Sequence, residues 1–114
     1  MTSPSKATVH TISASTVGRY VVGPAPVGDT APLLVGFHGY GQSAVEHLET
    51  LRGIPAAHRW QLASIQALHP FYQTRTGRVV ASWMTSQDRE QAIQDNVAYV
   101  RDVVTALRSS NPPG

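Results

Sequence analysis

The residues best placed to do chemistry form a glycine-rich turn, His38-Gly39-Tyr40-Gly41-Gln42. The turn directly follows the apolar run Leu33–Phe37 and precedes a helix start at Ser43. A turn in this position presents backbone N–H groups at the end of a buried strand and beside a helix N-terminus. Two chemistries use such donors: binding of a dinucleotide pyrophosphate, and stabilisation of the oxyanion of acyl transfer, where one donor lowers the barrier by about 3–4 kcal/mol.

The dinucleotide interpretation has one point in its favour and one against it. Gly39 to Ala44 matches the pattern G-x-G-x-x-G/A and lies between an expected strand and an expected helix, as the fingerprint requires. The fingerprint also needs an acidic residue at the end of the next strand, about 20 residues further on. That strand ends in Gln66-Ala67, and the next acidic residue is Asp88, beyond a whole loop. The missing acid makes this the less favoured interpretation.

The elements around the turn can be predicted from pattern. Leu33–Phe37 is continuously apolar, which indicates a strand covered on both faces. Ser43 and Glu46 form a capping box that predicts a helix over 43–52, and Gly53 supplies its stop. Trp60–Leu68 predicts a second buried strand. For the stretch after it, 70–77 is expected to be a loop and 78–81 a short extended piece.

The two ends of the chain complete the expected order. Ala7–Ser13 and Val17–Val22 are rich in β-branched residues and predict an N-terminal hairpin or meander. Thr85-Ser86-Gln87-Asp88 is a second candidate capping box, before a long helix that runs to Arg108. One face of that helix carries apolar residues spaced by 4, 3, 4 and 3, and we expect this stripe to be core: Ile93, Val97, Val100, Val104 and Leu107. The order predicts an α/β fold with an antiparallel start followed by parallel strands and crossover helices.

Several of these features together resemble the α/β-hydrolase superfamily. They are the strand Leu33–Phe37, the turn His38–Gly41, the spacing to Trp60–Ala67, the pair Ser82-Trp83 and the amphipathic helix after it. The likeness is greatest to the esterase/phospholipase/carboxylesterase branch, including feruloyl-esterase-like enzymes. It implies a serine esterase with an acyl-enzyme mechanism, acting on a small-molecule ester with no cofactor.

The resemblance also assigns roles and a domain. The backbone N–H of Tyr40 would be the oxyanion donor, and His38, Gly39, Gly41 and Gln42 would form the turn that holds it. Trp83 and Met84 would line the acyl pocket, with core packing as the alternative. Residues 1–114 would form a single partial α/β-hydrolase domain, the N-terminal half of the sheet.

The family's nucleophile cannot be found among the serines. It needs a G-x-S-x-G elbow, followed in the chain by an acid and a histidine. Ser43, Ser64 and Ser82 all lie outside such a motif. We therefore expect a domain truncated before the elbow and inactive on its own, with self-association through the unpaired edge of the Leu33–Phe37 strand. The alternative from another class is a non-catalytic α/β binding module.

Composition excludes other classes of function. The nine Lys/Arg and seven Asp/Glu residues form no basic run, which argues against nucleic acid. The absence of cysteine excludes disulfides and thiolate metal sites, and the five histidines lack metal-ligand spacing. No apolar run approaches the ~18 residues of a membrane span, and the N-terminus has no apolar signal stretch. We expect a cytoplasmic protein.

Overall fold

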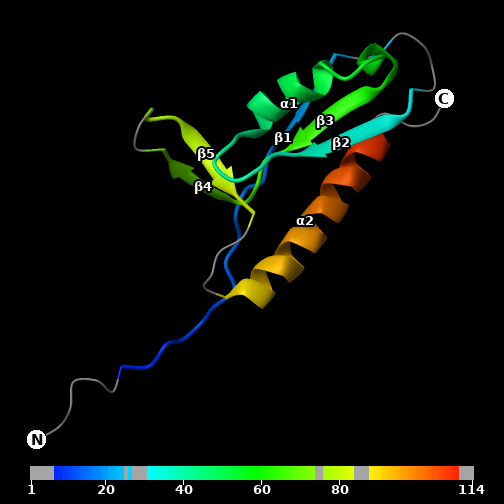
Figure 1. Cartoon of the computed structure of the whole chain (residues 1–114). Coiled ribbons are helices and arrows are strands. Elements are labelled where there is room, and N and C mark those ends of the chain that lie inside the picture. Colours follow the sequence, from blue (N-terminus) through cyan, green and yellow to red (C-terminus); the bar gives the residue numbers. More distant parts are fainter. Residues whose placement is uncertain (1–6, 25, 27–30, 74–75, 84–87, 111–114) are drawn as a thin grey trace, which may run out of the picture.

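The main sheet has three strands in the order β1-β3-β2 (Figure 1). The computed structural model describes residues 7–24, 26, 31–73, 76–83 and 88–110. Strand β2 (Leu33–Phe37) runs parallel to β3 (Gln61–Ile65), and β1 (Tyr20–Val22) pairs with β3 in the antiparallel sense. The prediction of mixed α/β content is confirmed, and β2 and β3 form a parallel pair.

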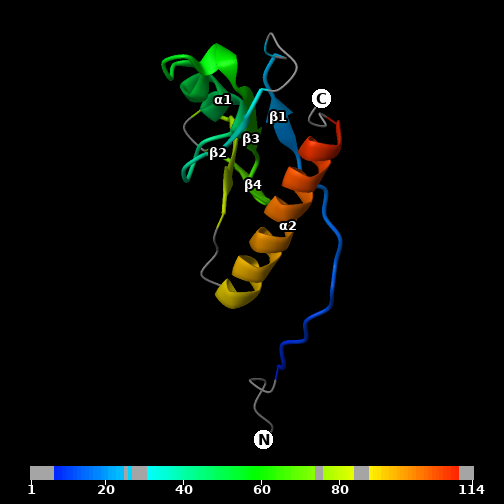
Figure 2. The ribbon, with the colours of Figure 1, turned by 90° about the vertical axis from the view of Figure 1, so that its right-hand side faces the viewer.

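The two helices cover opposite faces of this sheet (Figures 1 and 2). Helix α1 (Ala44–Arg52) packs Leu48 and Leu51 against Leu62 and Leu34. Helix α2 (Arg89–Ser110) packs on the other face, where the buried cluster joins α2 to alternate residues of β2 and β3: Val103 and Leu107 with Ala63, Ile65, Leu33 and Val35. All five residues of β3 are buried, as expected for a strand between two helical layers.

A second, two-stranded sheet corrects the prediction of a loop over 70–77. Strand β4 (His69–Tyr72) pairs antiparallel with β5 (Val79–Ser82), with Pro70 opposite Ala81. Proline is compatible with this strand because β4 is an edge and needs no N–H on its open side. An isolated bridge between Gln42 and Ala81 joins the hairpin to the glycine turn. A short 3₁₀ helix, η1 (Ala57–Arg59), precedes β3.

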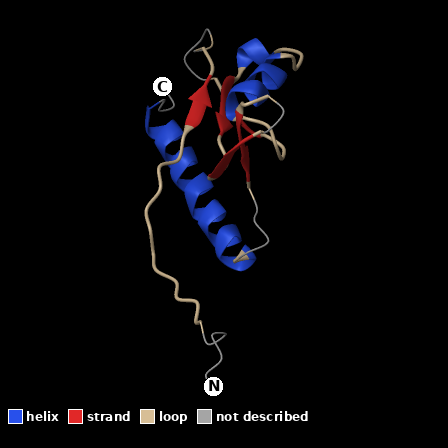
Figure 3. Ribbon diagram, turned by 90° about the vertical axis from the view of Figure 1, so that its left-hand side faces the viewer, coloured by secondary structure: helices blue, strands red, loops and turns tan. Residues whose placement is uncertain are grey.

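The predicted N-terminal hairpin is wrong. Residues 7–19 form no strand and run as an extended segment away from the body of the molecule (Figure 3). Val9, Ile12 and Val17 are each about nine-tenths exposed. The segment offers few apolar residues among its threonines and serines, so pairing it with β1 would bury little. The later part of the expected strand, Tyr20–Val22, pairs with β3 instead.

The apolar stripe of α2 is core only in part. Leu107 is buried and Val100 and Val104 are half-buried, but Ile93 is 44% and Val97 60% exposed. The buried face is centred on Ala92, Val103 and Leu107. The N-terminal half of α2, in which Ile93 and Val97 lie, runs past the ends of the strands (Figure 2). Residues 85–87 of the second capping box lie outside the described residues. Within the described part of the chain, neither helix has the length and apolarity needed to cross a membrane.

Candidate functional site

The glycine turn lies at the carboxyl end of β2 and has the geometry of a type II β-turn (Figure 1). The N–H of Gln42 donates to the carbonyl of Gly39 across 3.2 Å, which closes the turn. Gly41 occupies the third position with a φ of 73°. A type II turn requires positive φ at this position, and glycine adopts it without strain. Glycine at position 41 therefore follows from the turn itself.

Three of the four N–H groups in this turn have acceptors. Gly39 N–H donates to Oε1 of Gln42 across 2.8 Å, and Gly41 N–H donates to the carbonyl of Ala81 across 3.3 Å. Gln42 N–H closes the turn. Among the described residues, the N–H of Tyr40 has no acceptor, and the Tyr40 side chain is 79% exposed. The turn thus holds one donor available for a ligand, at the position that the sequence resemblance assigned.

His38 is a buried structural residue, 2% exposed. Its Nε2 accepts a hydrogen bond from the N–H of Ala67 across 3.0 Å. The ring proton must then lie on Nδ1, which donates to the carbonyl of Gly39 across 2.8 Å. Both ring nitrogens are occupied, so His38 joins the ends of β2 and β3 and has no free nitrogen for acid–base work.

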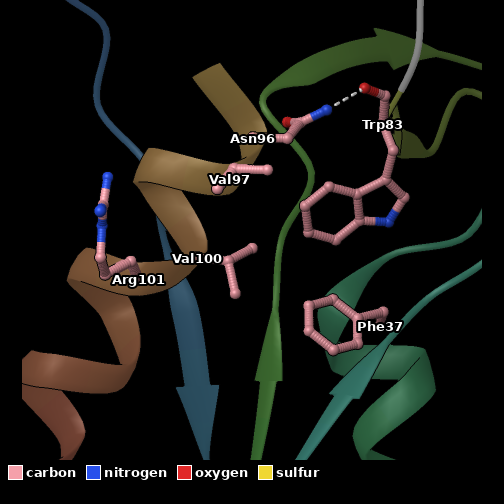
Figure 4. Close-up of a pocket in the computed structure, with 6 residues that line it drawn as sticks. All are labelled: Phe37, Trp83, Asn96, Val97, Val100 and Arg101. Carbon is pink, nitrogen blue, oxygen red and sulfur yellow. Dashed lines mark hydrogen bonds between the residues drawn. The ribbon is translucent and has the colours of Figure 1, made fainter. Parts of the chain in front are cut away.

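Trp83 connects the turn to an open apolar groove. Its Nε1 donates to the carbonyl of His38 across 2.9 Å, and its own carbonyl accepts from Nδ2 of Asn96 across 2.6 Å. The indole lies edge-on to the Phe37 ring, with centroids 5.7 Å apart. The groove has a volume of about 500 Å³ and lies between the end of β2 and helix α2 (Figure 4). Its lining comprises Phe37, Trp83, Asn96, Val97, Val100 and Arg101.

Of the two predicted pocket residues, Trp83 lies on this groove and Met84 lies outside the described residues. Sequence reasoning did not find Phe37, Asn96 or Arg101 as lining residues. The signal available for them was weak: Phe37 ends an apolar strand, and the two others flank the apolar stripe of α2. Only tertiary packing brings these positions together.

The N-terminus of α1 is already occupied by protein groups. Ala44 N–H donates to Oε1 of Gln66 across 2.7 Å, and Glu46 N–H donates to Oγ of Ser43 across 3.3 Å. The Ser43 hydroxyl in turn donates to Oε1 of Glu46 across 3.2 Å, so it serves as the helix cap. The Glu46 carboxylate also pairs with Arg78. A dinucleotide pyrophosphate would need these same helix donors, which speaks against that interpretation.

Two further serines are poorly placed for nucleophilic attack. Ser64 is completely buried in the middle of β3, and Ser82 is buried at the end of β5. Over the described ranges, no group of three or more His, Asp or Glu side chains gathers where it could hold a metal ion. Compared with protein-family models, curated protein sequences and solved structures, this chain matches none of them.

Proposed function

We propose that the turn 38–42 is an oxyanion-stabilising element of an acyl-transfer site. The chain then contributes half of a serine esterase of the carboxylesterase/phospholipase type, which acts on a small-molecule ester. The observation that carries the proposal is the Tyr40 N–H: it is the one donor of a rigid type II turn without an acceptor in the described structure. The nucleophile, acid and histidine of the mechanism would come from outside these 114 residues.

The chemistry follows from the rigidity of the turn. In acyl transfer, negative charge develops on the substrate carbonyl oxygen, and a donor that is already in place stabilises this charge without reorganisation. Here Gly39, Gly41 and Gln42 each hold the loop through a separate hydrogen bond. His38 and Trp83 fix the strand end beneath it. Tyr40 N–H would supply one donor, and the residue after the missing nucleophile would supply the second.

The first test removes the donor and leaves the turn. Proline is favoured at the second position of a type II turn, so Tyr40→Pro deletes the N–H while keeping the backbone path. Tyr40→Phe keeps the N–H and serves as the matched control. We expect methylphosphonate monoethyl ester, a tetrahedral oxyanion mimic, to shift the Tyr40 amide resonance of the ¹⁵N-labelled chain saturably. The amide at position 40 of the control would shift likewise, and the neighbouring Gly39 and Gly41 resonances would stop responding in Tyr40→Pro.

Two results would overturn the oxyanion assignment: no saturable shift in the unaltered chain, or equal binding by Tyr40→Pro. The assignment to a serine esterase has its own test, which is the coding DNA beyond codon 114. A G-x-S-x-G motif shortly downstream, after a further apolar strand, is the expected result. A stop codon at that point would favour a non-catalytic binding module built on the same turn.

A further inference from the structure

The side-chain amide of Gln42 is held in one orientation on the glycine turn. Its Oε1 accepts the N–H of Gly39 across 2.8 Å. Because a backbone N–H can only donate, the amide atom that faces it must be the oxygen, and Nε2 occupies the other branch of the amide. Within the described structure Nε2 has no acceptor. The Tyr40 N–H is the free main-chain donor of the turn, and the side chain of Gln42 adds a second kind of free donor.

The main chain of Gln42 is fixed as well as its amide oxygen. Its N–H donates to the carbonyl of Gly39 across 3.2 Å, and its carbonyl accepts from the N–H of Ala81 across 3.0 Å. The next residue, Ser43, caps α1. The side chain is thus tied at both ends, by the main chain and by Oε1. A ligand that binds Nε2 meets a side chain that has already lost much of its rotamer freedom, which is the property of a preorganised donor.

Gly39 provides the space for this arrangement. A Cβ at Gly39 would lie 3.3 Å from Oε1 and 3.7 Å from Cδ of Gln42, so the amide lies directly against the Gly39 backbone. Gly39, unlike Gly41, has no positive φ, so its backbone conformation does not call for glycine. The close contact with the Gln42 amide is the constraint that glycine relieves at position 39.

The two kinds of free donor lie near each other. The Tyr40 N–H follows the Gly39 N–H by one residue, and Nε2 and Oε1 of Gln42 are bonded to the same carbon. The hydrogen bond between Gly39 N–H and Oε1 therefore brings Nε2 next to the part of the turn that carries the Tyr40 N–H. Side-chain amides stabilise a developing oxyanion in the same way as backbone N–H groups, and two donors stabilise it more than one.

We propose that Nε2 of Gln42 is a second oxyanion donor of this turn, which donates to the same substrate oxygen as the Tyr40 N–H. The inference rests on the proposed function, because it concerns the same site and the same developing charge. Gln42 then has two roles that belong to different atoms. Oε1 holds the turn, and Nε2 contacts the substrate.

The first test is a titration of the ¹⁵N-labelled chain with methylphosphonate monoethyl ester. We expect the side-chain NH₂ resonances of Gln42 and the backbone amide of Tyr40 to shift saturably with the same dissociation constant. The side-chain NH₂ of Gln61 is the control in the same spectrum, because its Nε2 donates to the carbonyl of Gly23 at the opposite end of the sheet. A shift at Tyr40 without one at Gln42 overturns the second donor and leaves the oxyanion assignment standing. No shift at either group overturns both.

The second test separates the donor from the scaffold. Gln42→Glu keeps an oxygen that can accept the Gly39 N–H, but an ionised carboxylate has no hydrogen to donate. We expect phosphonate binding to weaken about tenfold, with the midpoint of urea unfolding close to that of the unaltered chain. Val45→Glu is the matched control, since it adds the same charge at a residue 62% exposed on the first turn of α1. Unchanged binding by Gln42→Glu, or equal weakening by Val45→Glu, would overturn the second donor.

Discussion

The aromatic side chain of Tyr99 connects two strand ends through hydrogen bonds. The Tyr99 hydroxyl of α2 reaches two carbonyls, Gln66 at 2.6 Å and Arg19 at 2.9 Å, and so ties α2 to the end of β3 and to the segment before β1. A Cβ at Gly18 would overlap the Tyr99 ring, which shows how closely the chain passes over it. Burial raises the pKa of the Tyr99 phenol above 10.0, and the hydrogen bond to Arg19 opposes that rise in part.

The raised pKa of Tyr99 predicts a loss of stability at alkaline pH. The folded pKa lies above the unfolded value of 10.0, so the contribution is full below that pH and is lost as pH rises through the folded pKa. We expect Tyr99→Phe to lower the free energy of unfolding at pH 7 by about 0.5–1.5 kcal/mol, for the lost hydrogen bond, and to show a smaller further decrease above pH 10 than the unaltered chain. Urea unfolding across this pH range measures both effects.

The control for this prediction is Tyr72→Phe, because the Tyr72 side chain is 75% exposed on β4. It should change the free energy of unfolding at pH 7 by no more than about 0.5 kcal/mol. Equal slopes for the unaltered chain and Tyr99→Phe would contradict the prediction.

At the scale of elements, the unit β2-α1-β3 depends on one close approach. Helix α1 crosses β2 at Gly36, where an added Cβ would lie 2.7 Å from Leu51 Cδ1 and 2.8 Å from the ring of His47. Glycine at this position lets Leu48 and Leu51 reach the sheet. The end of β2 and the start of α1 bracket the turn, so this packing also fixes the direction in which the turn faces.

Gly36→Ala is expected to destabilise the chain by about 1–3 kcal/mol, since the side chains of Leu51 and His47 must shift to make room for the added Cβ. Gly53→Ala is the matched control: Gly53 ends α1 with a φ of −80°, a conformation that alanine shares. A Cβ there would be 3.4 Å from the nearest atom, so the control should change stability by no more than about 1 kcal/mol. Chemical unfolding followed by circular dichroism compares the two. Equal stability of both variants would contradict the role of Gly36.

Elements whose ends are marked by nearby residues, such as a helix cap, a proline or a glycine, could be predicted from the sequence. The predicted strand Leu33–Phe37 has the same first and last residues as the observed β2. A proline precedes this apolar run and a glycine turn follows it, so both ends of the strand are marked in the sequence. The Ser43 cap and the Gly53 stop likewise fixed α1 to within a residue of the prediction. The turn could be predicted because glycine spacing specifies a backbone conformation directly.

Features that depend on the extent of the sheet could not be predicted. Helical periodicity identifies an apolar face on α2, but not how much of the helix the sheet covers, and Ile93 and Val97 lie on the part that runs past the strand ends. Strand β4 was missed because His69-Pro70 reads as a break, although an edge strand tolerates it. The groove combines Phe37 with residues of α2 about 60 positions later, and no local pattern reports such a contact.

The whole molecule is extended rather than spherical. Its radius of gyration is 18.4 Å, and its principal extents are 74 × 34 × 18 Å. A compact domain of this length would have a radius of gyration of about 13 Å. The exposed segment 7–19 accounts for much of the longest dimension (Figure 3). What remains is a thin body with a three-stranded sheet between two helices.

The isolated 114-residue chain is expected to show no turnover of p-nitrophenyl acetate above the buffer rate. Within the described structure, the Ser43 hydroxyl donates a hydrogen bond to Glu46 and not to a histidine that could act as a base. Ser64 and Ser82 are buried. The oxyanion donor that we propose at Tyr40 would have no effect without an attacking group. A spectrophotometric assay with Ser43→Ala as control checks this. Turnover that disappears on one specific side-chain substitution would contradict it.

The type II turn determines what side-chain mutagenesis can detect at this position. Its donor is main chain, and every residue except proline encodes the same N–H at position 40. An alanine scan across 38–42 would therefore show effects at the positions that hold the turn, which are His38, Gly39, Gly41 and Gln42. Alanine at position 40 would show little effect, because it keeps the N–H. The centre of such a site is invisible to ordinary side-chain mutagenesis. Among changes to position 40, proline or an amide-to-ester exchange made through chemical synthesis removes the N–H.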